Sequence, residues 1–182
     1  MPFAEEEHGF LVDALGSIEA PVFCCAGNHD LPVLDRLVEE LEAVGAPLLV
    51  DESRSVRLGQ DVVEVVGVNF HWRDARGELL AAIEGLPPTS AGYRILMAHD
   101  PRLFGWVPEG RFDLVLSGHT HGGQVGTNMF GIPWSVLRLF GVYDQGFFHR
   151  GPSRLYVHSG NWFTGLPPRM GIAGEVAVHR LV

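Results

Sequence analysis

The chain has 182 residues, of which 46% are hydrophobic and 19% are charged. This balance excludes an intrinsically disordered chain and leaves enough apolar surface for one globular domain with a hydrophobic core. Acidic residues outnumber basic ones by 22 to 13, giving a formal net charge of −9. This charge argues against a general nucleic-acid binder, because such proteins need a basic surface to displace phosphate counterions.

No segment of the sequence suggests export or a membrane span. The first residues are acidic and lack the basic start and apolar stretch of a signal peptide. No apolar run approaches the roughly 20 residues that cross a bilayer. Cys24 and Cys25 are neighbours in an apolar run, and we expect two small buried side chains rather than a disulfide. We therefore expect a cytoplasmic protein, either free or attached to the periphery of a membrane.

The first half of the chain predicts two helices, a short strand and a hairpin. Residues 5–17 have acidic residues in the first turn and apolar residues at helical spacing. Residues 33–44 show the same spacing and end at a glycine, which predicts a second helix. Between them, the apolar run 21–26 predicts a buried strand. Residues 56–68 predict a hairpin that turns near 59–61.

The second half predicts one helix, four strands and a long loop rich in glycine and aromatic residues. The alternation of helices and strands indicates an α/β layered fold, and no linker divides it, so we expect a single domain over 1–182. The helix is expected at 78–85, the strands at 94–98, 113–117, 155–158 and 174–181, and the loop at 122–150.

Three of the apolar strands are each followed at once by residue types that bind metal ions. Asn28 and His29 follow the first of these strands, His99 follows the second, and His119 and His121 follow the third. In open α/β sheets, ligands bind at the carboxyl ends of the strands. We therefore expect these five side chains to converge, although they are far apart in sequence.

The residue types also fit this interpretation. Gly118, Gly122 and Gly123 flank the histidine pair and permit a sharp turn. The amide oxygen of Asn28 suits Mn²⁺ or Mg²⁺, whereas imidazoles also suit iron and zinc. Residues 27–30 alone would equally fit a strand-to-helix turn with an aspartate cap, and the two interpretations are compatible. A His-x-His pair also occurs in metal hydrolases built on barrels, so the pair does not fix a family.

Together, these blocks resemble a known family. Gly27-Asn28-His29-Asp30, His99 and Gly118-His119-Thr120-His121 resemble the last three motif blocks of the calcineurin-like metallophosphoesterases. The extension through Gly122-Gly123-Gln124 and the stretch 160–169 resemble a subgroup related to bacterial membrane-associated phosphodiesterases, some of which act on nucleotide-linked lipids. The resemblance implies an αββα sandwich and a metal-dependent phosphoric-ester hydrolase, in particular a phosphodiesterase.

The resemblance also implies a role for each residue. Asn28, His99 and His119 would bind one divalent ion, and His121 would bind a second. His29 would stabilise or protonate the leaving oxygen. The two ions, drawn from Mn, Fe, Zn and Mg, would hold a hydroxide for attack on the phosphorus.

Two blocks of the family pattern are not found in the sequence. These are an Asp-x-His block and a Gly-Asp-x-x-Asp block, which would supply the remaining ligands and the carboxylate that bridges both ions. We expect the chain to begin just after them, with the N-terminal strands missing. One alternative is therefore an impaired fragment or remnant that binds at most one metal. Another is a mononuclear hydrolase on a different fold, with a carboxylate ligand from elsewhere.

The expected partners are a phosphoester substrate, lipid- or nucleotide-linked, and the periphery of a membrane. Residues 129–143 are aromatic and apolar, with Arg138 as their one charged side chain. They predict either a lipid-facing patch beside the active site or a buried loop, and the sequence favours neither. His71 and His149 are weaker candidates for the substrate pocket.

Overall fold

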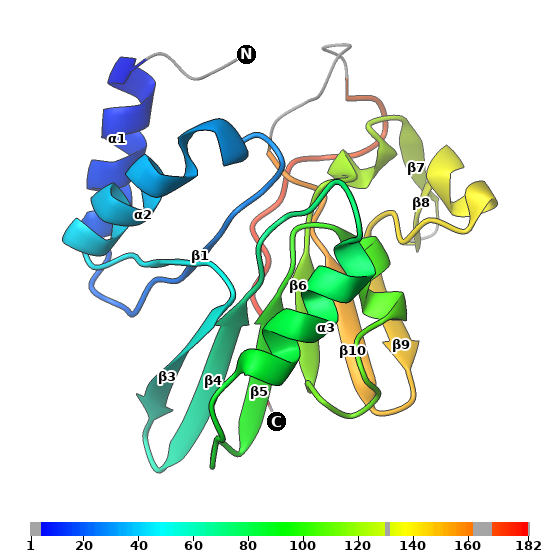
Figure 1. Cartoon of the computed structure of the whole chain (residues 1–182). Helices are drawn as coiled ribbons and strands as arrows, with labels where there is room; N and C mark the ends of the chain where they lie inside the picture. The colour runs from blue at the N-terminus through cyan, green and yellow to red at the C-terminus, as the bar shows by residue number, and fades with distance from the viewer. Residues whose placement is uncertain (1–4, 130–131, 162–168, 182) are drawn as a thin grey trace. The chain divides into compact units, whose positions relative to one another are not determined.

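The computed structural model describes residues 5–129, 132–161 and 169–181, and it divides into two compact units, Met1–His99 and Asp100–Val182 (Figure 1). Each unit combines helices with strands, which confirms the predicted α/β class. The single domain over 1–182 stays a prediction. Within the part of the chain that is described, the helices are all too short or too polar to cross a membrane.

The first unit has the predicted helices and hairpin, and a glycine ends α2 as expected, with Gly45 at a φ of 77°. The strands β3 and β4 are antiparallel, β5 runs parallel to β4, and β1 runs parallel to β2. The elements are α1 (Glu5–Gly16), β1 (Cys24–Cys25), η1 (Leu31–Val33), α2 (Leu34–Ala43), β2 (Leu48–Leu49), β3 (Glu52–Leu58), β4 (Asp61–Gly67), α3 (Ala75–Gly85) and β5 (Tyr93–Met97).

Two details of this unit differ from the prediction. The helix α3 begins three residues earlier than expected, because Asp74 caps it by accepting a hydrogen bond from the amide of Gly77. The helix α1 forms where expected, but only part of its apolar face is covered. Val12 and Leu15 pack on a core cluster near α2 and β2, whereas Phe10 is 77% exposed.

The second unit contains a three-stranded sheet and a separate hairpin. The strand β10 lies between β6, which is parallel to it, and β9, which is antiparallel, while β7 pairs with β8. The core includes Phe104, Phe112 and Val115. The elements are η2 (Pro101–Gly105), β6 (Leu114–Ser117), η3 (His121–Gly123), β7 (Gly126–Met129), β8 (Ile132–Ser135), η4 (Val136–Phe140), β9 (Gly146–Arg150) and β10 (Ser153–Val157).

Two predictions for the second unit are wrong. Residues 122–150 are not one long loop, because they contain β7, β8, η4 and β9. These elements are only four or five residues long, so their apolar patterns are too short to stand out. Residues 174–181 alternate between half-buried and exposed positions like a strand, yet they form no strand. Alternation alone does not make a strand without a partner for the backbone.

Candidate metal centre

The first unit brings together two of the predicted ligands. Asn28 lies in the turn that follows β1, and His99 lies two residues beyond the end of β5. The Nε2 atom of His99 is 3.1 Å from the Oδ1 atom of Asn28, and both residues are partly buried. Two atoms that bind one ion at right angles, each about 2.1 Å away from it, are ~3 Å apart. The pair therefore has a spacing that fits two ligands of one divalent ion.

The turn that carries Asn28 packs tightly against the imidazole of His99. A Cβ atom at Gly27 would lie 2.9 Å from Cε1 of His99, which is closer than two carbon atoms approach without strain. The amide of Gly27 donates to the carboxylate of Asp30 at 2.7 Å and closes the turn. Asp30 therefore occupies the N-cap position of η1, as expected, but its carboxylate accepts from the preceding turn instead of capping η1.

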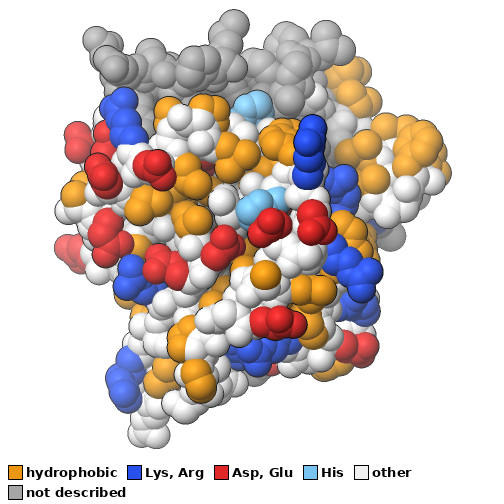
Figure 2. All heavy atoms as spheres, in the orientation of Figure 1, with side chains coloured by type: hydrophobic (Ala, Val, Ile, Leu, Met, Phe, Trp, Pro, Cys, Tyr) orange, Lys and Arg blue, Asp and Glu red, His pale blue; other side chains and the backbone are white. Residues whose placement is uncertain are grey.

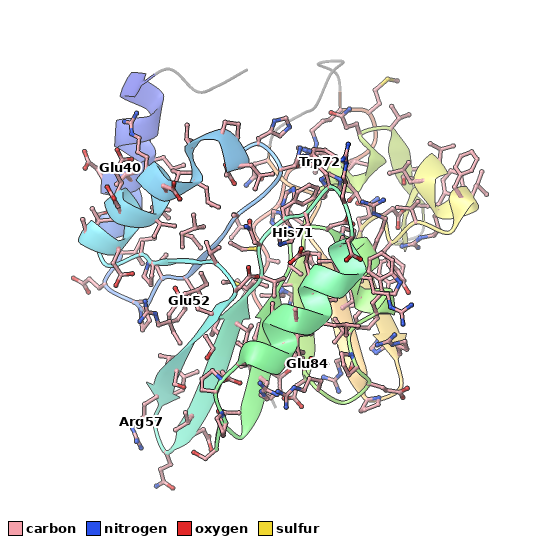
Figure 3. The ribbon with its side chains drawn as sticks, viewed as in Figure 1. Glu40, Glu52, Arg57, His71, Trp72 and Glu84 are labelled. Atoms are coloured by element: carbon pink, nitrogen blue, oxygen red, sulfur yellow. The ribbon has the colours of Figure 1, made fainter. Side chains whose placement is uncertain are left out.

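His99 also contacts an aromatic cluster that was not among the predicted site residues. The buried ring of Phe70 lies edge-on to the His99 ring, with 5.9 Å between centroids, and Trp72 packs edge-on against Phe70 at 4.8 Å. Figure 3 shows His71 and Trp72 in the segment that follows β4, at the opposite end of that strand from Arg57. The available signal was a pair of aromatic residues directly after a buried strand.

His29 and His71 have different surroundings. His29 is exposed on the turn next to Asn28, whereas His71 is half-buried. The catalytic role of His29 and the pocket role of His71 both stay predictions, as does that of His149, which is exposed on β9.

In the second unit, the histidine pair is held in an unusual backbone conformation. His119 and His121 follow β6 with φ angles of 68° and 51°. Side chains other than glycine rarely adopt this left-handed region, and such residues cluster at functional sites. Hydrogen bonds from Thr120 to Gly118 and from Gly123 to Thr120, both 2.8 Å, tighten the turn.

Asp100 supplies a buried negative charge close to His119. Its carboxylate accepts from Nε of Arg102 at 2.8 and 3.0 Å and from the backbone amide of the same residue at 2.9 Å. Burial raises the pKa of Asp100, but the hydrogen bonds and charge of Arg102, together with His119, outweigh burial and leave the pKa below its ordinary value. The carboxyl group is therefore ionised at neutral pH. Asp100 directly follows His99 in the sequence, but it was not among the predicted site residues.

His121 has neighbours from the C-terminal part of the chain. A Cβ atom at Gly160 would lie 3.6 Å from Nδ1 of His121 and 3.9 Å from the guanidinium of Arg169. Arg169 donates to the carbonyl oxygens of Ser159 and Ala173, both at 2.9 Å. It thereby fixes the turn beside His121. The stretch 160–169 was expected to matter, but 162–168 lie outside the described residues.

The donor atoms in the two units suit a divalent cation. An amide oxygen and imidazole nitrogens are ligands that Mn²⁺, Fe²⁺ and Zn²⁺ accept. Within residues 5–129, 132–161 and 169–181, no three or more His, Cys, Asp or Glu side chains gather as a metal cluster. The assignment of Asn28, His99, His119 and His121 as ligands stays a prediction.

Comparisons with known proteins give the chain its family. The family model for the calcineurin-like phosphoesterases matches residues 4–123, which include all five predicted site residues. Phosphodiesterase YaeI of Escherichia coli is 32% identical over 122 residues, 65% of this chain and 43% of YaeI. The uncharacterized metallophosphoesterase YkuE of Bacillus subtilis is 34% identical over 99% of this chain and 63% of YkuE. The uncharacterized metallophosphoesterase YkoQ of the same organism is 24% identical over 88% of this chain and 60% of YkoQ.

This chain therefore spans less than two thirds of each of these relatives. No solved structure matches it. The family match extends over well over half of the chain and through all three of its histidine-bearing motifs. The chain belongs to the calcineurin-like phosphoesterase family, whose members use divalent metals.

Proposed function

We propose that this chain hydrolyses phosphoric esters, as a phosphodiesterase, at a dinuclear divalent metal site. The observation that carries the proposal is the 3.1 Å approach of the His99 Nε2 atom to the Asn28 Oδ1 atom. The family match and the printed name of the Escherichia coli relative support the same reaction. The strained backbone at His119 and His121 supports a functional role for that pair as well.

In this proposal, Asn28, His99 and His119 hold one ion and His121 holds the other, with Mn, Fe, Zn or Mg as the metals. When bound, such ions neutralise the phosphoryl oxygens and supply a nucleophile by lowering the pKa of water. The protein carries a net charge of −9, so a phosphate ester needs local positive charge in order to bind. The imidazole of His29 is exposed beside Asn28 and donates a proton to the leaving oxygen.

The substrate in this proposal has an apolar part, as a lipid- or nucleotide-linked phosphodiester has. The support comes from η4, within the predicted patch 129–143. Leu139 and Phe140 are 70% and 77% exposed, and Figure 2 shows hydrophobic side chains gathered over this segment. Such a surface suits peripheral contact with a membrane. Residues 130 and 131 of the patch lie outside the described residues.

The test is metal stoichiometry combined with turnover of a chromogenic phosphodiester, bis(p-nitrophenyl) phosphate, in the presence of Mn²⁺. We expect two bound ions in the parent and a loss of turnover of about 100-fold or more in Asn28→Ala and His99→Ala. The matched control is His179→Ala, which removes an imidazole that packs on Tyr156 rather than a predicted ligand.

The possible outcomes separate the alternatives. One bound ion without turnover would favour the impaired fragment that binds at most one metal. Turnover that survives both ligand substitutions would overturn the assigned site. Metal binding that His99→Ala leaves intact would favour a mononuclear hydrolase with ligands from elsewhere.

A further inference from the structure

The second unit contains an ion pair, formed by buried Asp144 and partly exposed Arg138, that the proposed reaction does not use. Asp144 is fully buried. Its Oδ2 atom accepts hydrogen bonds from the amide and the hydroxyl of Ser135 at 3.1 and 3.0 Å. Its Oδ1 atom accepts from Nε of Arg138 at 2.9 Å, and the same guanidinium donates to the carbonyl oxygen of Gln145 at 3.0 Å. The guanidinium also lies over the ring of Phe148.

This group of residues contacts the histidine turn directly. The hydroxyl of Thr120, the residue between the two histidines, donates to the backbone carbonyl of Asp144 at 2.5 Å. A Cβ atom at Gly123 would lie 2.6 Å from the hydroxyl oxygen of Ser135. A Cβ atom at Gly122 would lie 3.2 Å from the amide oxygen of Gln145. The turn therefore contacts Ser135, Asp144 and Gln145, the residues that surround the ion pair.

The turn needs contacts that stabilise it from outside, because its backbone is strained. His119 and His121 both have left-handed φ angles, a conformation that persists only when the surroundings enforce it. Backbone hydrogen bonds inside the turn fix its local shape, and the hydrogen bond from Thr120 to Asp144 ties the turn to the segment after η4. An ion pair removed from water gains little net stability, because desolvation of the charges offsets their attraction. In some proteins such a pair instead specifies one local conformation.

We propose that Thr120, Ser135, Arg138 and Asp144 form a positioning network that holds His119 and His121 in their left-handed turn. None of the four touches the reacting atoms in this proposal. They act through the backbone of the turn, as outer residues act on metal-ligating histidines in general. The link to metal binding rests on the proposed function, whereas the link to backbone conformation does not.

The experiment compares Thr120→Val, which is close in shape but lacks the hydroxyl, with Thr120→Ser, which keeps it. The first readout is the three-bond amide-to-Cα proton coupling of His119 and His121, measured by NMR in metal-free protein. We expect Thr120→Val to shift both couplings away from their left-handed values and Thr120→Ser to preserve them. The second readout is the affinity for Mn²⁺ by isothermal titration, which we expect to fall about 10-fold in Thr120→Val and to stay within about twofold of the parent in Thr120→Ser.

Controls keep the result independent of folding and of the proposed function. Thr89→Val removes a hydroxyl that accepts from the amide of Ala91 in an exposed turn of the other unit, and it should change neither readout. Ser135→Ala is the second variant if Thr120→Val does not fold, because it cuts the same network at another point. Parent couplings in both folded variants would overturn the proposal. If the parent binds no Mn²⁺, the proposed function fails, while the couplings still decide the positioning role.

Discussion

The two pairs of predicted ligands are held in place in contrasting ways. In the first unit, the ring of His99 packs closely against the backbone at Gly27 and contacts the ring of Phe70, so packing holds it. In the second unit, His119 and His121 depend on left-handed backbone and on a network of buried polar groups.

The contrast indicates how each pair can be disturbed. Close packing against a ring is sensitive to added atoms, because there is no room to accept them. A strained turn that contacts the residues around an ion pair is sensitive to the loss of a charge or a hydrogen bond. Such a loss leaves a buried polar group without its partner. The predictions that follow test this difference between the two units.

The largest expected effect comes from Arg138→Met, which leaves the carboxylate of Asp144 buried without its cation. Removing one partner of a buried ion pair costs ~3–5 kcal/mol, and since Arg138 is itself partly exposed, we expect the free energy of unfolding to fall by about 3 kcal/mol. Urea denaturation followed by circular dichroism measures it.

The matched control for Arg138→Met is Arg36→Met. Arg36 pairs with Glu40 on the exposed side of α2, at a distance of 2.7 Å. Such surface pairs contribute about 0.5 kcal/mol or less. If the free energy of unfolding falls equally in the two variants, water solvates the Asp144–Arg138 pair. The second unit would then not depend on this ion pair in the way described above.

The second prediction separates backbone strain from crowding within the histidine turn. Gly123→Ala forces a side chain into a φ of 75° and against Ser135, whereas Gly45→Ala meets a similar φ of 77° with open space around it. We expect a loss of about 1 kcal/mol at Gly45, for conformation alone, and of ~2–3 kcal/mol at Gly123, where overpacking adds to it. Thermal unfolding of both variants measures the difference in stability. Equal losses of stability would contradict the close contact between Gly123 and Ser135.

Some of this arrangement could be predicted from the sequence. The rule that ligands gather at the carboxyl ends of strands placed Asn28 near His99, and the structure brings these two side chains together. The glycines around His119 and His121 indicated a sharp turn. The turn, however, places the histidines themselves in left-handed backbone, and a list of flanking glycines does not reveal that.

The rest depended on tertiary packing. The contact between Phe70 and His99 joins the ends of two strands, and no local pattern records which aromatic ring covers which histidine. The same holds for Asp144, whose carboxylate meets Ser135 and Arg138 through the folding of a segment that was expected to be a loop. Burial of a charge is set by the whole fold, so its partner cannot be read from spacing alone.

The third prediction disturbs the first unit by adding one carbon atom. In Gly27→Ala the new methyl group would lie 2.9–3.0 Å from the His99 ring, so the ring and the turn that carries Asn28 must shift relative to each other. We expect a loss of about 1–2 kcal/mol in stability, from overpacking, and a weaker affinity for Mn²⁺. The control is Gly92→Ala, at an exposed position with open space around it. If Gly27→Ala binds Mn²⁺ as the parent does, the ring of His99 is not fixed by packing.

The smallest expected effect is a shift in the pKa of Tyr156, which reports on the contacts of Glu175 in the second unit. Burial, followed by the hydrogen bond and the charge of Glu175, raises the pKa of Tyr156 to about 12. The same Glu175 oxygen accepts from the amide of Ser159 at 2.8 Å, in the turn beside His121. Absorbance at 295 nm after a rapid jump in pH, with Tyr156→Phe subtracted, should show this late ionisation.

The direction of the pH dependence follows from linkage. The unfolded chain loses the Tyr156 proton near pH 10, whereas the folded chain keeps it until about pH 12. The contribution of this group to stability is therefore fully present below pH ~10 and is lost as the pH rises through about 12. Glu175→Gln should lower the pKa of Tyr156 without restoring its ordinary value, because burial remains. An ordinary pKa in the parent would mean that Glu175 does not hold β10 to the C-terminal segment. The support beside His121 would then rest on the hydrogen bonds from the Arg169 guanidinium to the carbonyl oxygens of Ser159 and Ala173.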